Sequence, residues 1–212
     1  MKIAVIQAST QTAKNNLIFE ETKCAVADKN WQVFNFGVYE NEENFSYIQI
    51  SLCGGLLLNS GAIDFVVTGC SSGNGMSIVA NSLPNVICGY LPTPSDAYLF
   101  GRINQGNCAS LPLGLNFGWA GELNLRFTLE KLFEEPMNSG YPAEAAERKK
   151  RDMMKMEEVK TLAQTDIIHV FQNLDNEFID PIFKKKDLVT FILENGKNAE
   201  LVDFLKQNIQ LN

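Results

Sequence analysis

The sequence predicts an α/β protein built on a doubly wound parallel sheet. Up to residue 141, short apolar and β-branched runs alternate with segments of helical length, an order that β-α-β crossovers of a parallel sheet produce. The runs are continuously apolar, as expected of strands that helices cover on both faces. After residue 141 mixed charges become dense, which is typical of solvated helices. We therefore expect a three-layer, Rossmann-like five-stranded sheet at 1–141 and a helical C-terminal extension at 142–212.

The expected elements follow one another along the chain. The predicted strands are the apolar runs 3–6, 33–36, 63–67 and 86–88 and the less apolar 108–111. The helices expected between and after them are 12–28, 45–60, 75–82, 95–105 and 119–133. In the extension, helices are expected at 143–163, 167–178, 188–194 and 199–209, with Pro181 and Gly196 as breaks.

Composition narrows the classes of function. The net charge is −7 at pH 7, so nucleic acid and anionic membranes are disfavoured as partners. His169 is the single histidine, which excludes a multi-histidine metal site. The odd number of scattered cysteines favours unpaired thiols in a reducing compartment, and no apolar run has the length of a signal-peptide core or a bilayer span. We expect a cytoplasmic protein that needs no metal or other cofactor.

One loop carries the strongest chemical signal. The third predicted strand runs into TGCSSGNGMSI at 68–78, where glycines precede an expected helix. Glycine lets the backbone approach a ligand closely, and a helix N-terminus directs unsatisfied N–H groups at it. The loop therefore predicts an anion cradle. It is neither a dinucleotide fingerprint, because Ile78 replaces the third glycine, nor a P-loop, because it lacks the lysine.

Cys70 ends this predicted strand beside the helix N-terminus. Such a position lowers the pKa of a thiol, and the thiolate then acts as a base or nucleophile opposite N–H groups that stabilise an oxyanion. The alternative is a small apolar residue that fills a strand end. The remaining cysteines are expected to be packing residues: Cys24, Cys53, Cys88 and Cys108.

The loop resembles the signature CGTGxGxxxxxN of the type B ribose-5-phosphate isomerases and galactose-6-phosphate isomerases. Cys70, Gly73, Gly75 and Asn81 match it without gaps. Residues 96–107 resemble the family's second segment, SAxLxxxHNDxN. The resemblance extends over residues 1–135 and is strongest at 63–107, while the tail continues past the end of shorter family members.

This resemblance implies an aldose–ketose isomerase that moves a proton between C1 and C2 of a sugar phosphate through a cis-enediolate, without a metal. By position, Cys70 is the base, Ser72 replaces a threonine hydroxyl near the sugar, and Asn104 hydrogen-bonds the sugar or the enediolate. The anion hole is expected from the loop: Ser71, Ser72, Gly73, Asn74 and Gly75. Because family sites lie between subunits, a homodimer or a dimer of dimers is implied.

The sequence departs from the family at the groups that open the sugar ring and hold phosphate. Ile103 stands where the ring-opening histidine is expected, and Ala8-Ser9-Thr10-Gln11 replaces a DHxG segment. Ser9, Thr10 and Gln11 either bind phosphate or cap the first helix. The paired phosphate arginines have no clean counterpart, and the candidates are Arg148, Arg151 and Arg102. The run from Arg148 to Arg151 is also typical of a solvated helix face.

These departures lead to a hypothesis about the substrate and leave a second class of function open. A sugar that cannot close a ring needs no ring-opening group, so we expect an open-chain sugar phosphate such as a tetrose 4-phosphate or a pentulose 5-phosphate, unless another residue opens the ring. The alternative to an enzyme is a non-catalytic sugar-phosphate sensor, which needs the cradle but not Cys70. A flavin-binding module is a further alternative. His169 is expected to be structural, and the segment 117–119 to pack the last core helix.

Overall fold

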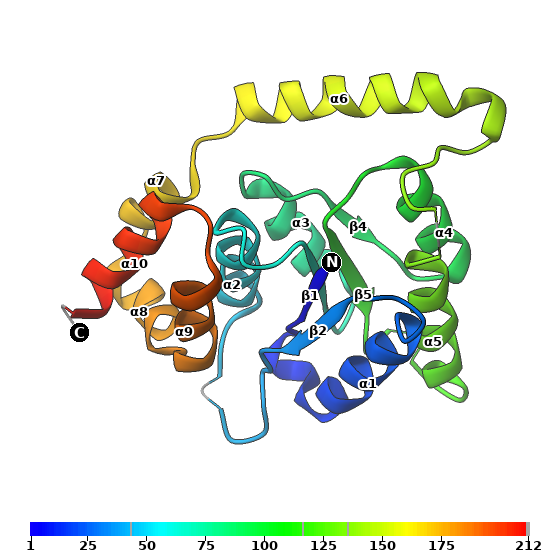
Figure 1. The fold of residues 1–212 in the computed structure, drawn as a ribbon. Helices are drawn as coiled ribbons and strands as arrows, with labels where there is room; N and C mark the ends of the chain where they lie inside the picture. Colours follow the sequence, from blue (N-terminus) through cyan, green and yellow to red (C-terminus); the bar gives the residue numbers. More distant parts are fainter. Residues whose placement is uncertain (43, 116, 135, 211–212) are drawn as a thin grey trace.

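The computed structural model describes residues 1–42, 44–115, 117–134 and 136–210. Its centre is a parallel sheet of five strands in the order β2-β1-β3-β5-β4, seen in Figure 1. The strands are β1 (Lys2–Val5), β2 (Gln32–Asn35), β3 (Phe65–Cys70), β4 (Cys88–Tyr90) and β5 (Cys108–Pro112). The prediction of a doubly wound, five-stranded parallel sheet is confirmed, with shifts at the strand ends.

Helices cover both faces of the sheet. The helices on one face are α1 (Asn15–Ala25), α4 (Pro94–Ile103) and α5 (Gly121–Leu132), and those on the other are α2 (Tyr47–Asn59) and α3 (Asn74–Ser82). Successive side chains of a strand point to opposite faces. In β1, Ile3 and Val5 pack in the core under α1 and α5, while Ala4 packs in the core under α2 and α3. The strands are continuously apolar because both of their faces are buried.

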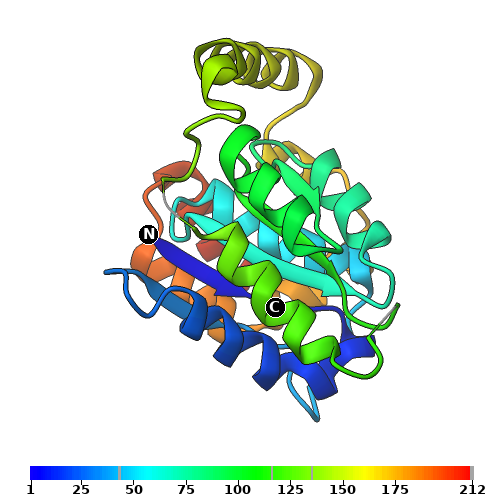
Figure 2. The same ribbon diagram turned by 90° about the vertical axis from the view of Figure 1, so that its right-hand side faces the viewer.

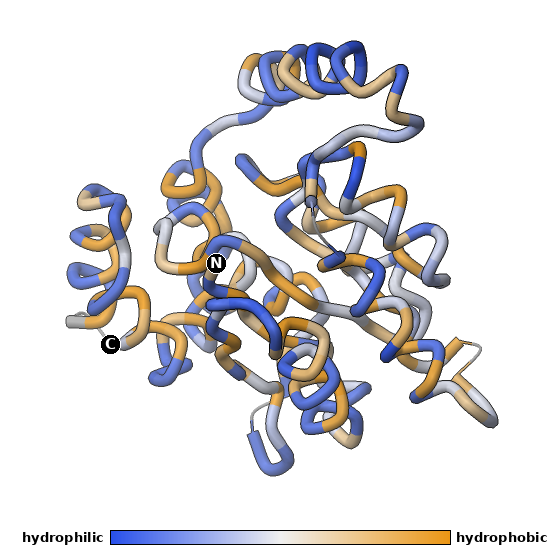
Figure 3. Tube along the Cα trace, turned by 45° about the vertical axis from the view of Figure 1, so that its right-hand side comes forward, coloured by the Kyte–Doolittle hydropathy of each residue, from blue (hydrophilic) through white to orange (hydrophobic). Residues whose placement is uncertain are grey.

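The C-terminal extension is helical, as expected. A short 3-10 turn (Ala143–Ala145) leads into α6 (Ala146–Ala163), which stands away from the sheet in Figures 1 and 2 and is mostly hydrophilic in Figure 3. It is followed by α7 (Ile167–Gln172), α8 (Asn176–Lys184), α9 (Lys186–Asn195) and α10 (Ala199–Gln210). Helices α7–α10 share one hydrophobic core with α2. The tail thus adds a layer outside α2, and its division from the α/β domain at residue 141 stays a prediction.

Three expected elements differ in the structure. Pro181 was expected as a break but lies inside α8. Proline removes the hydrogen bond to the carbonyl four residues earlier; that carbonyl belongs to Glu177, an exposed residue, so water can replace the donor. The expected helix 12–28 begins earlier, with a 3-10 turn at Ser9–Lys14. The expected helix 167–178 is divided into α7 and α8, and Asp175 caps the second by accepting from the Glu177 N–H at 3.0 Å.

Candidate active site

The sheet has a switch point between β1 and β3. The chain leaves β1 toward α1 on one face of the sheet and leaves β3 toward α3 on the other. The loops after these neighbouring strands therefore diverge, and open α/β sheets bind ligands in the crevice beyond the carboxyl ends of strands at such a point. Two segments flank it: the first loop (residues 8–14) and the Cys70 loop (residues 70–75).

Cys70 ends β3 at this crevice and is half-buried. The Cys70 and Ser71 carbonyls accept hydrogen bonds of 2.9 Å from the N–H groups of Leu113 and Gly114, so the segment after β5 holds the start of the loop. Within the described ranges, three successive N–H groups of the loop meet no acceptor: those of Ser71, Ser72 and Gly73. The structure thus places a thiol next to a row of unpaired amide donors, which is the arrangement that stabilises a developing oxyanion.

Gly73 gives the Cys70 loop its turn. It precedes α3 with φ 77° and ψ −24°, in the left-handed region that favours glycine. Its carbonyl accepts 2.6 Å from the Ser110 hydroxyl and 3.1 Å from the Ser77 N–H. Two residues on, a Cβ at Gly75 would come within 3.3 Å of the Tyr47 ring. The loop is therefore held by contacts from β5 and α2, and a Cβ would clash at Gly73 and be tight at Gly75.

Gly73→Ala is expected to damage the loop more than the fold. A Cβ there would lie 2.7 Å from the Tyr90 ring and 3.0 Å from the backbone of Leu111, and the left-handed conformation costs an alanine about 1–2 kcal/mol. We expect turnover to fall by about 10²-fold because the N–H groups are displaced. Steady-state kinetics and thermal unfolding measure both effects. Gly118→Ala, where a Cβ meets nothing within 4 Å, is the matched control, and equal activity of the two variants would contradict this account of the loop.

The first loop reaches the Cys70 loop through side chains. The buried Gln11 donates from Nε2 to the Ser71 hydroxyl at 2.9 Å, and the Thr10 hydroxyl lies 3.4 Å from the same oxygen. Ser9 donates to the Phe45 carbonyl at 2.9 Å. No side chain in this loop caps the 3-10 turn or α1. The capping interpretation of Ser9, Thr10 and Gln11 was therefore wrong, because these side chains bond to neighbouring loops instead.

Asn104 lies at the amino ends of the strands, whereas Cys70 lies at their carboxyl ends. It is exposed at the C-terminal end of α4, before β5 begins, whereas Cys70 pairs with Pro112 at the end of β5. Helix α6 lies at the same side of the sheet, beyond the amino ends of the strands, which we call the amino edge. It begins against Gly140, whose N–H donates to the Arg102 carbonyl. At its other end, Lys160 and Gln164 donate to the Asn81 carbonyl. One chain therefore does not bring Asn104 and Cys70 together.

The three candidate arginines are also away from the Cys70 loop. Arg148 and Arg151 are exposed on α6, and Arg148 pairs with Asp152 on the same helix at 3.0 Å. Arg102 is buried and pairs with Glu134 at 3.1 Å. The hydrogen bond from Lys131 and the charge of Arg102 hold the pKa of the Glu134 carboxyl below its usual value. Arg102 thus connects α4 to the segment after α5 through its ion pair.

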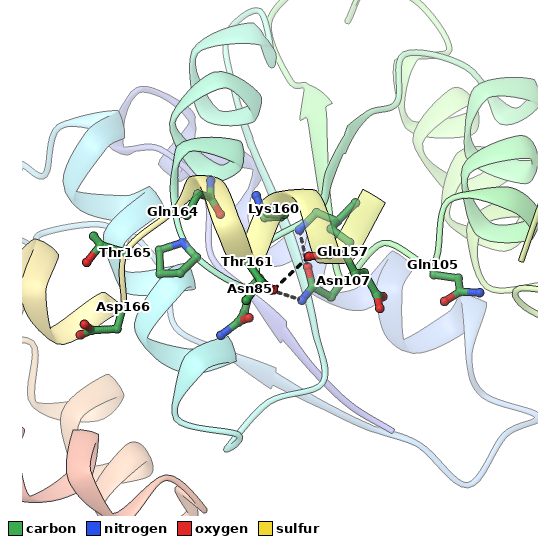
Figure 4. A pocket seen from close by; sticks show the side chains of 11 residues that line it. Asn85, Gln105, Asn107, Glu157, Lys160, Thr161, Gln164, Thr165 and Asp166 are labelled. Atoms are coloured by element: carbon green, nitrogen blue, oxygen red, sulfur yellow. Dashed lines mark hydrogen bonds between the residues drawn. The ribbon is translucent and has the colours of Figure 1, made fainter. Parts of the chain in front are cut away.

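A pocket of about 420 Å³ opens at the amino edge, between α6 and the segments that precede β4 and β5. Figure 4 shows polar residues in its lining, with Lys160 on α6 and Gln164 directly after this helix. The Asn107 amide donates to the Asn85 carbonyl at 2.7 Å across its floor. No cysteine lines this pocket, and in the described part of the chain no three His, Cys, Asp or Glu side chains lie close enough to hold a metal ion.

The structure confirms some of the remaining predictions about single residues and corrects others. Cys53, Cys88 and Cys108 are buried packing residues, and burial raises the pKa of the Cys53 thiol to about 12. Cys24 is exposed, so its assignment to the core was wrong. Trp119 was expected to pack α5 but is 101% exposed, because the chain turns at Ala120 before the helix begins. His169 is exposed on α7, away from the crevice.

Comparison with known proteins decides the family. Residues 3–131 match the Ribose/Galactose Isomerase family. The chain belongs to this family. A crystal structure of a 4-deoxy-L-threo-5-hexosulose-uronate ketol-isomerase complexed with a tartrate is 39% identical with a TM-score of 0.94, over 99% of this chain and 100% of that one. A ribose-5-phosphate isomerase from Vibrio parahaemolyticus is 35% identical with a TM-score of 0.93, over 98% and 99% of the two chains.

The likeness to shorter proteins shows the fold. A ribose 5-phosphate isomerase from Thermotoga maritima is 24% identical with a TM-score of 0.58, and 97% of it aligns with 74% of this chain. The two full-length neighbours, by contrast, also cover the C-terminal extension. Comparison with curated proteins gave no match. None of the helices in the described ranges is long and apolar enough to cross a membrane.

Three residues at the crevice of this ribose/galactose isomerase family member were not predicted from the sequence. Ser110 fixes the Gly73 carbonyl, Tyr47 covers Gly75, and Lys14 bonds to Gln11 at 3.0 Å. The sequence holds no signal for Ser110 or Tyr47, since both reach the loop from elements far along the chain. Lys14 follows the first strand closely enough to have been considered with Ser9 and Thr10.

Proposed function

We propose that this protein is an aldose–ketose isomerase whose base is Cys70 and whose oxyanion hole is the Cys70 loop. The observation that carries the proposal is the half-buried thiol at the end of β3, beside unpaired N–H groups at the switch point of the sheet. Membership of an isomerase family supports the same reaction class. The proposed reaction uses no metal and no cofactor, because the protein's own donors suffice for each step.

The proposed reaction balances within the site. The Cys70 thiolate removes the proton from C2 of the aldose, and the electron pair forms the C1–C2 double bond while charge collects on O1. The N–H groups of Ser71, Ser72 and Gly73 hold this oxygen, helped by Asn74 and Gly75 at the start of α3. The Ser72 hydroxyl passes the O2 proton toward O1. The Cys70 thiol exchanges its proton with solvent while the enediolate is held, then delivers a proton to C1, and the carbonyl stands at C2.

The proposed substrate is an open-chain sugar with an anionic end. The chain has Ile103 in place of a ring-opening histidine, and the arginines offered for phosphate lie at the amino edge or in a structural ion pair. A phosphorylated sugar that cannot close a ring, such as a tetrose 4-phosphate, fits these features. The protein is then cytoplasmic and acts in carbohydrate metabolism.

A second candidate is an open-chain uronate, favoured by the neighbour of 39% identity that covers the whole chain. In a 4-deoxy-5-hexosulose uronate the oxygen that would close a furanose is absent and C5 is a carbonyl. Such a substrate needs no ring opening, and its carboxylate replaces the phosphate. The two candidates share the chemistry at C1 and C2 and differ in the anion at the far end of the molecule.

A panel of substrates tests the proposed function. We expect turnover of the tetrose 4-phosphate, the pentulose 5-phosphate or the 4-deoxy-5-hexosulose uronate, with ribose 5-phosphate and hexose 6-phosphates slower by about tenfold or more because the protein lacks a group that opens rings. Fast turnover of the ring-forming phosphates alone would overturn the open-chain proposal. Binding of these sugars without turnover of any would instead identify the sensor that the sequence left as an alternative.

We also propose a homodimer, or a dimer of such dimers, in which Asn104 of one protomer completes the crevice at Cys70 of its partner. Inactive Cys70→Ala and Asn104→Ala variants, when co-expressed, are then expected to recover about a quarter of wild-type activity, because half of the dimers are mixed and each mixed dimer keeps one intact site. Cys70→Ala with Ser72→Ala is the control and should recover nothing. Recovery absent from both mixtures would contradict a shared site.

A further inference from the structure

Lys14 places a cation beside the Cys70 loop. Its ammonium donates to the Gln11 Oε1 at 3.0 Å and lies 4.8 Å from the centre of the Phe117 ring. The opposite end of the same amide, Gln11 Nε2, donates to the Ser71 hydroxyl at 2.9 Å. Two hydrogen bonds in series therefore tie this ammonium to the loop that holds the proposed oxyanion.

Gln11 fixes the position of this cation. The residue is 8% exposed, and both ends of its amide are used, one by Lys14 and one by Ser71. An amide with both ends bonded cannot rotate without losing two hydrogen bonds. The distance between the ammonium and the Cys70 loop is thus set by a buried group and not by the flexible lysine stem alone.

The charge of Lys14 is not neutralised by the protein. Its partners are an amide oxygen and an aromatic ring, and no carboxylate of the described residues pairs with it. Lys185 is the contrast: its fully buried side chain pairs with Glu42 and Asp187. Lys14 is half-buried as a residue. An ammonium with neutral partners keeps its attraction for an anion, whereas one between two carboxylates does not.

We propose that Lys14, positioned by Gln11, binds the terminal anion of the substrate and so determines specificity for acid-terminated open-chain sugars. The inference rests on the proposed isomerase function, since it needs C1 and C2 to lie at the Cys70 loop. The ammonium of a lysine is a point charge and lacks the planar two-donor geometry of an arginine guanidinium. The same ammonium can therefore bind a carboxylate or a phosphate.

Binding of unreactive analogues tests this assignment without turnover. Calorimetry compares threonate, threitol 4-phosphate and the neutral threitol on the full-length protein. We expect wild type to bind at least one of the two anions more tightly than threitol. Lys14→Met should lower the affinity for that anion by about tenfold or more and leave the affinity for threitol unchanged. Lys14→Arg keeps the charge and should retain most of the preference. The tighter of the two anions identifies the terminal group.

The control is Lys23→Met, because Lys23 lies on α1, nine residues after Lys14, is 5.2 Å from a phenylalanine ring and has its charge paired with Glu20 on the same helix. It should leave all three affinities unchanged. With a turned-over acid-terminated sugar, Lys14→Met should raise KM by the same factor and change kcat by less than about threefold. Equal loss of threitol and anion binding in Lys14→Met, or no anion preference in wild type, would overturn the assignment. A wild type that prefers the anions yet isomerises no sugar refutes the proposed function alone.

Discussion

Cys70→Ala is expected to lower kcat by about 10³-fold or more, because the general base is removed while the oxyanion donors remain. The Ser71, Ser72 and Gly73 N–H groups belong to the backbone and are fixed by Leu113 and Ser110. An alanine at residue 70 fits the same space, so substrate affinity should change by less than about threefold. Single-turnover kinetics and calorimetry with an unreactive analogue measure the two effects separately.

The control for this variant is Cys24→Ala, which removes an exposed thiol on α1 and should leave turnover unchanged. If Cys70→Ala isomerised its substrate at the wild-type rate, Cys70 would not be the base, and the alternative of a small residue that fills a strand end would stand. Loss of folding is a separate outcome that far-UV circular dichroism and thermal unfolding detect.

Lys185→Met is expected to lower the free energy of unfolding by about 3 kcal/mol, because it breaks a buried ion pair from one side. The Lys185 side chain is 0% exposed and its ammonium pairs with Glu42 and Asp187. Glu42 also accepts the Tyr39 N–H at 2.8 Å. Methionine would fill the space but leave the two carboxylates without their cation. Urea unfolding monitored by circular dichroism measures the change.

The same ion pair connects the C-terminal extension to the crevice. Lys185 stands at the junction of α8 and α9, and Glu42 lies in the loop between β2 and α2. The Phe45 carbonyl of that loop accepts the Ser9 hydroxyl. We therefore expect Lys185→Met to raise KM as well. Lys206→Met, which breaks an exposed pair with Asp203, should cost less than about 0.5 kcal/mol, and an equal effect of the two variants would contradict the role given to Lys185.

Sheet and loop were predictable from the sequence because their signals are local. The β-strands were visible because burial on both faces forces continuous apolar runs, and the Cys70 loop because glycines between a strand and a helix have few other uses. Pro181 shows the limit of such signals: a helix tolerates proline where the freed carbonyl reaches water. The predictions that Cys24 and Trp119 are packed inside were wrong for a related reason, since apolar character alone does not show which face of a helix or loop is covered by other residues.

The arrangement of the candidate site depended on contacts between distant segments. Nothing in the sequence places Gln11 against Ser71, Ser110 against Gly73 or Lys185 against Glu42, because each pair forms only after the strands take their order in the sheet. The position of Asn104, at the opposite ends of the strands from Cys70, likewise follows from the direction of α4.

Exchange of carbon-bound hydrogen with solvent deuterium tests the central claim most directly. The wild-type protein is incubated in D₂O with tetrose 4-phosphate, pentulose 5-phosphate, ribose 5-phosphate, hexose 6-phosphate or 4-deoxy-5-hexosulose uronate, and deuterium at C1 and C2 is followed by NMR. Proton transfer through an enediolate predicts deuterium at C1 or C2 of at least one sugar, and none in the Cys70→Ala variant. Isomerisation without any deuterium uptake, or uptake that Cys70→Ala retains, would contradict a solvent-exchanging cysteine base.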